Sequence, residues 1–269
     1  GAAGPEALEV VLRLRLPRAL AAFGTGAALA VAGALMQVLL RNPLADPYVL
    51  GTSSGAAVTA LTAMLLGASG LAVDAAAFAG ALGSTLLVFG LARGAGSWST
   101  DRLLLTGIVV AAGWSAVVSL MLAISPDNKL RGIIFWLMGD FSFVEQPGSM
   151  LLVAAIGVAG GMLLARTLDL LGTGDKQAAL LGLEVRRTRA MVYALGSLLT
   201  AVAVTTAGVV GFVGLIVPHF IRLAGGNSHR IVIPASALAG GTLLVIADTL
   251  ARTVLAPQQL PVGAITAAV

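Results

Sequence analysis

Long apolar segments alternate with short polar stretches along almost the whole of this chain. A transmembrane helix needs about 20 largely apolar residues. Segments that reach or approach this length cover residues 17–40, 54–72, 75–92, 103–124, 148–165, 190–209, 209–225 and 233–251, and a further apolar run begins near residue 261. The pattern predicts an all-α membrane protein, a polytopic helical bundle with eight to nine spans visible, in a single transmembrane domain over residues 1–269.

Composition supports a lipid environment. Hydrophobic residues make up 58% of the chain, charged residues 10%, and the mean hydropathy is +0.99, whereas soluble proteins are roughly half apolar and about a quarter charged. The 34 glycines and the alanine runs suit helices that pack closely in a membrane. The net charge of +4 is attributed to cytoplasmic loops and not to nucleic-acid binding. The absence of cysteine excludes disulfides and thiolate chemistry.

The basic residues predict which side of the membrane each loop faces. If Arg41 is cytoplasmic, strict alternation of the spans also places segments 93–102, 166–189 and 222–230 in the cytoplasm. That side then holds Arg41, Arg93, Arg102, Arg166, Lys176, Arg186, Arg187, Arg189, Arg222 and Arg230, against Arg13, Arg15, Arg18, Lys129, Arg131 and Arg252 outside. Because cytoplasmic loops carry an excess of lysine and arginine, this orientation is preferred.

A polar, glycine-punctuated insert over 171–189 separates two of the apolar segments on the basic side. The pattern predicts two short helical pieces, around Asp175–Leu181 and Glu184–Arg189, separated by Gly182. Such a compact knob has no role in spanning lipid. We therefore expect it to bind a partner in the cytoplasm.

The segment 209–225 is short and is interrupted by Gly211, Gly214 and Pro218. Irregular backbone within a membrane is tolerated only where protein or a water-filled cavity covers it, so we expect this segment to be covered. Asp248 lies in a span, where an acid is costly. We expect it to pair with Arg252, four residues later on the same helix, and not to couple protons. His219 is interpreted as a structural residue and not as a metal or haem ligand.

The outer arginines Arg13, Arg15 and Arg18 lie at the start of the first visible span. Two interpretations remain open. Their charged ends can extend to the lipid headgroups, or they can form a basic rim that binds carboxylates of an extracytoplasmic partner, for which the planar guanidinium is suited.

Two classes of enzymatic function find no support in the sequence. The chain lacks the G-x-x-x-x-G-K-[ST] phosphate loop, so it is not expected to hydrolyse ATP by itself. With two histidines, no cysteine and no clustered carboxylates, it also lacks the constellation of an intramembrane enzyme. The alternative kept open is an ion-coupled secondary transporter, although these usually place ionisable residues near mid-bilayer.

Several spaced strings resemble the permease family of bacterial ABC importers for iron–siderophores, haem and cobalamin, the type II importers. They are Arg15-Leu-Pro-Arg18, Gly33-Ala-Leu-Met-Gln37, Arg41-Asn-Pro-Leu-Ala45, Ser99-Thr100-Asp-Arg-Leu-Leu-Leu105, Phe135-Trp-Leu-Met-Gly139, Gly211-Phe-Val-Gly-Leu215, Pro218-His219 and Leu260-Pro-Val-Gly263. The resemblance implies about ten transmembrane helices in the full chain, with the first and most of the last missing from this sequence. It implies the bacterial inner membrane as location and a bulky metal chelate as substrate, without choosing among haem, ferric siderophore and cobalamin.

The resemblance also implies partners and site residues, and no cofactor. The family works as a homodimer with two cytoplasmic ATP-binding-cassette ATPase subunits and one periplasmic substrate-binding protein. By resemblance, the residues that couple to the ATPase are Lys176, Ala178, Gly182, Arg186 and Arg187. Those that dock the binding protein are Arg15, Arg18 and Arg252. The cytoplasmic gate is expected at Asn42, Pro43 and Leu44 together with Ser99 and Thr100.

Overall fold

A computed structural model describes residues 9–93, 99–142, 147–255 and 258–268, and these fold into helices with no strand among them. A π-helical turn η1 (Val11–Arg15) leads into α2 (Leu16–Leu39), and a 3-10 turn η2 (Pro47–Leu50) precedes α3 (Thr52–Leu65). The later helices are α4 (Leu71–Arg93), α5 (Thr100–Ile124), α6 (Asp127–Leu137), α7 (Pro147–Gly172), α8 (Asp175–Leu180), α9 (Val185–Ala207), α10 (Val213–Gly225), α11 (His229–Thr253) and α12 (Val262–Ala268). The predicted all-α fold class is confirmed.

Within the described residues, six helices are long and apolar enough to cross a membrane: Val11–Leu39 and helices α4, α5, α7, α9 and α11. Two predicted spans are shorter than expected. The segment 54–72 yields α3 of 14 residues, and 209–225 yields α10 of 13 residues. α3 ends early because Gly67 and Gly70 adopt positive φ angles of +90° and +55°, so the apolar residues that follow begin α4. α6 was not predicted.

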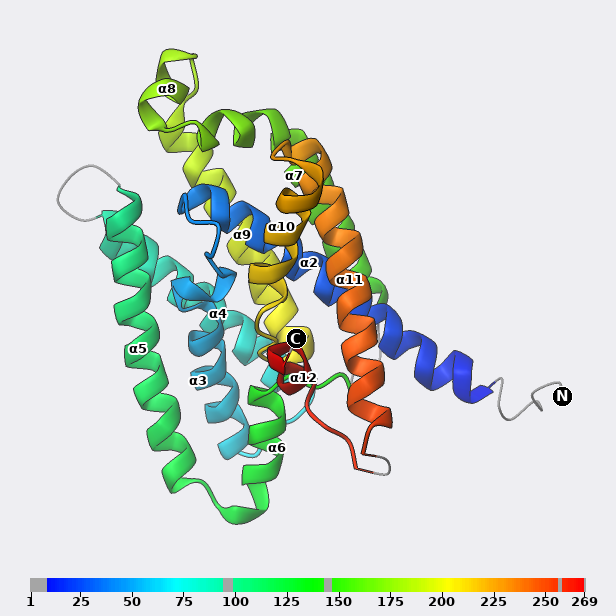
Figure 1. Cartoon of the computed structure of the whole chain (residues 1–269). Coiled ribbons are helices and arrows are strands. Elements are labelled where there is room, and N and C mark those ends of the chain that lie inside the picture. Colours follow the sequence, from blue (N-terminus) through cyan, green and yellow to red (C-terminus); the bar gives the residue numbers. More distant parts are fainter. Residues whose placement is uncertain (1–8, 94–98, 143–146, 256–257, 269) are drawn as a thin grey trace, which may run out of the picture.

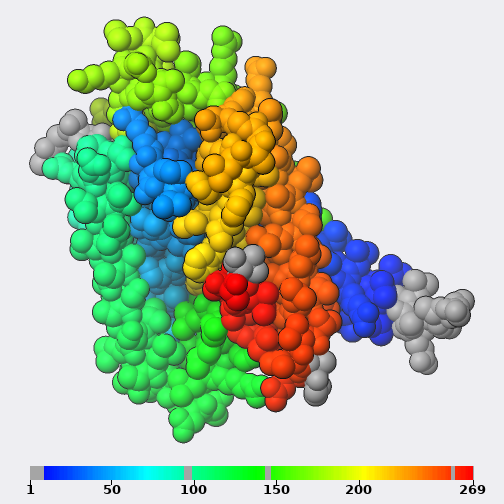
Figure 2. Space-filling view, in the orientation of Figure 1, coloured from blue at the N-terminus to red at the C-terminus, as the bar shows by residue number. Residues whose placement is uncertain are grey.

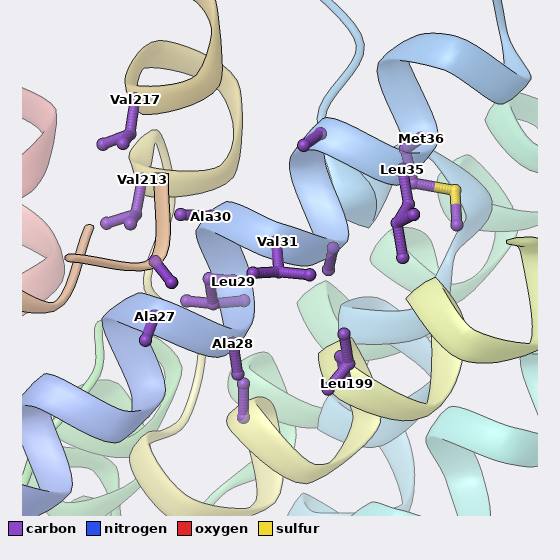
Figure 3. Close-up of a cluster of buried hydrophobic side chains, with 14 of the residues drawn as sticks. Ala27, Ala28, Leu29, Ala30, Val31, Leu35, Met36, Leu199, Val213 and Val217 are labelled. Atoms are coloured by element: carbon purple, nitrogen blue, oxygen red, sulfur yellow. The ribbon is translucent and has the colours of Figure 1, made fainter. Parts of the chain in front are cut away.

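α2 is the central helix of the bundle. It packs against α7, α9, α10 and α11, and most of its residues are buried. Figure 3 shows its apolar side chains facing Val213 and Val217 of α10 and Leu199 of α9. A Cβ atom added to Gly33 would lie 1.8 Å from the carbonyl oxygen of Gly214. Only glycine therefore permits the backbone contact between α2 and α10, which accounts for one glycine in each of two motifs noted above.

Backbone contacts satisfy the irregular segment between α9 and α10. Gly208 and Phe212 both have a φ of +70°, so the helix is broken here. The backbone N–H of Asp140 donates to the carbonyl of Ala207 at 2.9 Å, and that of Val210 donates to the Tyr48 hydroxyl at 3.3 Å. Val210 is buried. Protein groups therefore satisfy part of the backbone at this break, although Phe212 itself is exposed.

The segments predicted to be cytoplasmic lie at one end of the bundle. Figure 1 shows α8, the end of α2, the start of α5 and the turn between α10 and α11 together at the top, whereas the turn from α5 to α6 and the end of α11 lie below. In the space-filling view, α8 projects beyond the rest of this end, and α5 forms one flank of the molecule (Figure 2). The arrangement agrees with the alternation of spans predicted from the loop charges.

Candidate functional site

The insert between α7 and α9 forms a rigid knob at the cytoplasmic end. α8 closes with hydrogen bonds from Gly182 N–H to the Ala179 carbonyl and from Leu183 N–H to the Ala178 carbonyl, both 3.0 Å. This is a Schellman closure, and Gly182 supplies the left-handed residue with a φ of +84°. The first predicted helical piece is therefore present as α8. The second is not separate, because the chain after Glu184 continues directly into α9.

The knob presents both basic and apolar side chains. Of the predicted coupling residues, Lys176, Arg186 and Arg187 are exposed, but Ala178 of α8 is completely buried. Ala178 therefore offers no surface to a partner in this conformation, and its assignment to ATPase coupling stays a prediction. It packs inside the knob because it lies on the inner face of α8. Sequence reasoning missed Leu180 and Leu181, whose exposed fractions are 86% and 64%. The sequence did contain a signal for this apolar surface, because two leucines stand next to Gly182 in an otherwise polar insert.

A cluster of opposite charges holds the base of the knob. The Asp175 carboxylate accepts from Arg41 and lies 3.0 Å from Nη2 of Arg189. The same Nη2 donates to the hydroxyl of Thr100 at 2.6 Å. We call Arg41, Asp175 and Arg189 the inner cluster. Through Arg189, the inner cluster also contacts Thr100, a predicted gate residue.

The two predicted gate loops lie at this same end. Asn42 accepts from the backbone N–H of Leu44 at 2.9 Å, which stiffens the turn, and Pro43 and Leu44 are exposed. Ser99 caps α5 by accepting from Arg102 N–H at 3.2 Å. Residues 94–98 of the second loop lie outside the described residues.

Asp46 closes the first gate loop as the cap of η2. Its carboxylate accepts from the backbone N–H of Tyr48 at 2.7 Å. Burial raises the pKa of Asp46 from 3.8 to about 6, although the hydrogen bond from Tyr48 opposes the shift. Burial in this loop therefore favours the protonated form of the carboxyl group.

An open groove of about 640 Å³ runs beside these loops. Its walls come from the ends of α2 and α7 and from the turn between α10 and α11, and polar contacts cross it. Gln37 donates to the carbonyl of Leu215 at 2.9 Å and accepts from Arg222. Asp169 lies 2.9 Å from the backbone N and 2.5 Å from the ring Nδ1 of His229. These pairs join α2 to α10 and α7 to α11, and neither was predicted.

A second charged cluster lies at the outer end. Asp248 pairs with Arg252 at 3.1 Å, as predicted from their spacing, and also with Arg18 at 2.8 Å. We call these three residues the outer cluster. The Asp248 side chain is 1% exposed and that of Arg18 is 11% exposed, so Arg18 faces mainly inward. Of the three predicted docking arginines, Arg15 alone is exposed.

Another outer basic residue also has an internal partner. Lys129 of α6 donates to the backbone carbonyls of Met64 at 3.1 Å and Leu65 at 2.9 Å. These carbonyls end α3, where a positive charge is favourable. The fold therefore accounts for the position of Lys129 on the less basic side of the membrane.

Comparison with known proteins places this chain among transport permeases. The model of the FecCD transport family matches residues 1–269. The chain is 42% identical, over 98% of its length and 72% of the relative, to the cobalamin import system permease protein BtuC of Halobacterium salinarum. It is 43% identical, over 96% of its length and 79% of the relative, to the hemin transport system permease protein HmuU of Yersinia pestis.

Solved structures give the same result. One assigned as a metal-chelate type ABC transporter in an inward-facing conformation matches with a TM-score of 0.89 and 31% identity, over 100% of this chain and 87% of that one. PsaBC from Streptococcus pneumoniae matches with a TM-score of 0.66 at 15% identity, over 96% of this chain and 89% of that one, a likeness of fold alone. Nothing in these comparisons supports the ion-coupled alternative.

Proposed function

Because this chain belongs to the FecCD transport family, we propose that it carries a bulky metal chelate from the periplasm into the cytoplasm, powered by a separate ATPase. The chain is an ABC importer permease, a multi-pass protein of the inner membrane, and like its relatives it is not an enzyme in itself. Relatives named for cobalamin and for hemin are almost equally similar to it. The candidate substrates are therefore haem, ferric siderophore and cobalamin.

The observation that carries the proposal is the exposed knob at the cytoplasmic end. Leu180 and Leu181 form an apolar centre, with Lys176, Arg186 and Arg187 around it. An apolar centre with a charged rim is the usual anatomy of a protein interface. We assign this surface to an ATP-binding-cassette ATPase, one on each of two permease subunits, because the chain lacks a phosphate loop of its own.

We assign the flank formed by α5 to the interface between two copies of this chain in a homodimer. Among the residues of α5, only Leu103 and Gly107 are buried, and the exposed residues include Ala112, Ala116, Ser119 and Ala123 on one face. Small residues let helices approach closely in a membrane. Pairing of two α5 helices would put Ser99 and Thr100 of both subunits near the dimer axis, beside Asn42, Pro43 and Leu44, where a cytoplasmic gate belongs.

The outer end is assigned to a periplasmic substrate-binding protein. Arg15 is exposed there and is free to meet a carboxylate of a partner. Arg18 and Arg252 already share Asp248, so their part in docking is to present the remaining N–H groups of their guanidinium groups. This gives Arg15 the leading role among the three arginines.

Reconstitution tests the function. The permease, its ATPase and its binding protein are assembled in liposomes, and uptake of cobalamin, hemin and a ferric siderophore is measured. We expect uptake of one chelate that requires ATP and is unchanged by ionophores that collapse ion gradients. A hydrolysis-deficient ATPase is the matched control. Uptake that proceeds without ATPase, driven by an ion gradient, would contradict the proposal.

A further inference from the structure

The inner cluster joins four separate elements through one carboxylate. Arg41 follows the end of α2, Asp175 begins α8, and Arg189 lies in the second turn of α9. Both arginines contact Asp175, and Arg189 also donates to Thr100 at the start of α5. A chain of polar contacts thus runs from Arg41, beside the first gate loop, through the knob to Thr100. Figure 1 shows the end of α2, α8 and the start of α5 at the same end of the bundle.

The backbone at Arg41 indicates that its side chain is needed. Arg41 has a φ of +48°, in the left-handed region that costs every residue except glycine. It occupies the closing position of a Schellman motif, with bonds from Arg41 N–H to Val38 at 3.2 Å and from Asn42 N–H to Gln37 at 3.1 Å. Glycine is the usual residue there, so the arginine is retained against backbone preference, and Asp175 is the contact that its guanidinium makes.

Arg189 depends on its contacts in the cluster because its side chain is buried. Its side chain is 5% exposed, whereas Arg186 and Arg187 one turn earlier face solvent. A buried guanidinium is costly without partners, and its contacts include the Asp175 carboxylate and the Thr100 hydroxyl. If α8 moved alone, Arg189 would lose the carboxylate. The cost of that loss favours movement of α8, α9 and the start of α5 together.

We propose that Asp175 is a positioning residue that transmits movement of α8 to both gate loops, through Arg41 to Asn42–Leu44 and through Arg189 to Thr100. The proposal rests on the proposed function, because it assumes that an ATPase moves α8. Charge-assisted hydrogen bonds are strong and directional, so they can transmit a movement of α8 in either direction. In this proposal Asp175 acts through the two arginines that it contacts.

The decisive variant is Asp175→Asn, which keeps the shape of the side chain and removes its charge. Three quantities are measured in the assembled transporter: affinity for the ATPase, rate of ATP hydrolysis, and chelates taken up per ATP. We expect the first two to be retained and the third to fall about tenfold, in the range of typical coupling between sites. Asp101→Asn is the matched control, because Asp101 is an exposed acid at the same end and outside the cluster.

Arg41→Gly separates coupling from stability. Glycine relieves the left-handed strain, so the melting temperature should stay equal or rise, while uptake per ATP should fall as in Asp175→Asn. If Asp175→Asn loses ATPase affinity together with uptake, or if both variants transport like the wild type, the relay is wrong. If the wild type itself shows no ATP-driven uptake, the proposed function fails instead, so the two failures are distinguishable.

Discussion

The two ends of this molecule each carry an aspartate between two arginines, but in opposite surroundings. At the outer end, Asp248 is 1% exposed and joins α2 to α11, two long helices packed side by side. At the inner end, Asp175 is 40% exposed and joins the terminal residues of helices and loops. The same chemical groups are therefore placed once in the body of the bundle and once at its cytoplasmic edge.

The difference in burial implies a difference in role. Breaking a buried ion pair by removing one partner costs about 3–5 kcal/mol, because a charge is left without compensation. An exposed pair contributes about 0.2–1 kcal/mol and can be rearranged at little cost. The outer cluster is suited to hold α2 and α11 in one arrangement. At the inner end, only the pair of Arg41 with Asp175 is exposed in this way, whereas Arg189 is buried, so the inner cluster is suited to move as a unit during a transport cycle.

The largest effect is expected at the outer cluster. Asp248→Asn removes the carboxylate that Arg18 and Arg252 share, and leaves Arg18 with the more distant Asp140 at 3.7 Å and the Ser142 hydroxyl. We expect the melting temperature in detergent to fall on the order of 10 °C, equivalent to about 3–5 kcal/mol. Asp127→Asn, an exposed acid of the outer end, is the control and should change it by no more than about 2 °C. A variant at Asp248 that melts like the wild type would remove the distinction between the clusters.

The second effect tests what moves the inner end. Leu180→Ser removes an exposed leucine from the knob, so folding should be unaffected. Burial of a leucine side chain is worth about 1.5–3 kcal/mol, which predicts a loss of about 10- to 100-fold in ATPase affinity. Leu66→Ser, an exposed leucine at the opposite end, is the control. Equal affinity of both variants for the ATPase would place docking elsewhere on the cytoplasmic surface.

A smaller effect separates docking from stability at the outer end. Arg15→Glu should fold normally and weaken binding-protein docking a few-fold, mainly through the association rate and with strong dependence on salt. Arg18→Glu should instead destabilise the permease, because it opposes Asp248 with a second carboxylate. The measurements are the association and dissociation rates of the binding protein and the melting temperature of each permease variant. If Arg15→Glu docks normally at low salt, extension of Arg15 to the lipid headgroups is the better interpretation.

The smallest effect concerns Asp46 in the first gate loop. Its pKa is raised from 3.8 to about 6, so the folded state holds the proton more tightly than the unfolded state. The contribution of Asp46 to stability should therefore be largest below pH 3.8, fall as the pH rises towards about 6, and stay constant above. Asp46→Asn keeps an acceptor for Tyr48 N–H and removes this dependence. At pH 7 the variant should melt at a higher temperature than the wild type, because it no longer buries a charged group, and a shared pH profile would contradict the assignment.

The sequence was sufficient for features that depend on neighbouring residues. Six of the eight apolar segments predicted as spans form helices long enough to cross a membrane, and the spacing of four residues predicted the pair of Asp248 with Arg252. It was insufficient for contacts between distant residues. Arg18 and Asp248 are 230 positions apart and meet because α2 and α11 touch backbone to backbone, where a Cβ on Gly26 would lie 2.2 Å from the Gly240 carbonyl. Periodicity along one helix carries no information about such a crossing.

The inner cluster illustrates the same limit. The polar insert and its closing Gly182 were evident from composition, and the insert is present as a knob. The burial of Arg189 was not evident, because Arg186, Arg187 and Arg189 look alike in sequence. Only the direction of each side chain on α9 separates two solvent-facing arginines from one that reaches Asp175 and Thr100.

The most direct test of the contrast between the clusters is a distance at the gate. The chain has no cysteine, so Ser99→Cys permits one spin label per subunit in the assembled dimer. The label-to-label distance is measured with and without ATP, in the wild-type background and with Asp175→Asn. We predict that ATP changes the distance in the wild type and leaves it nearly unchanged with Asp175→Asn, although ATP hydrolysis continues. A change of wild-type size in the Asp175→Asn background would contradict the role given to the inner cluster.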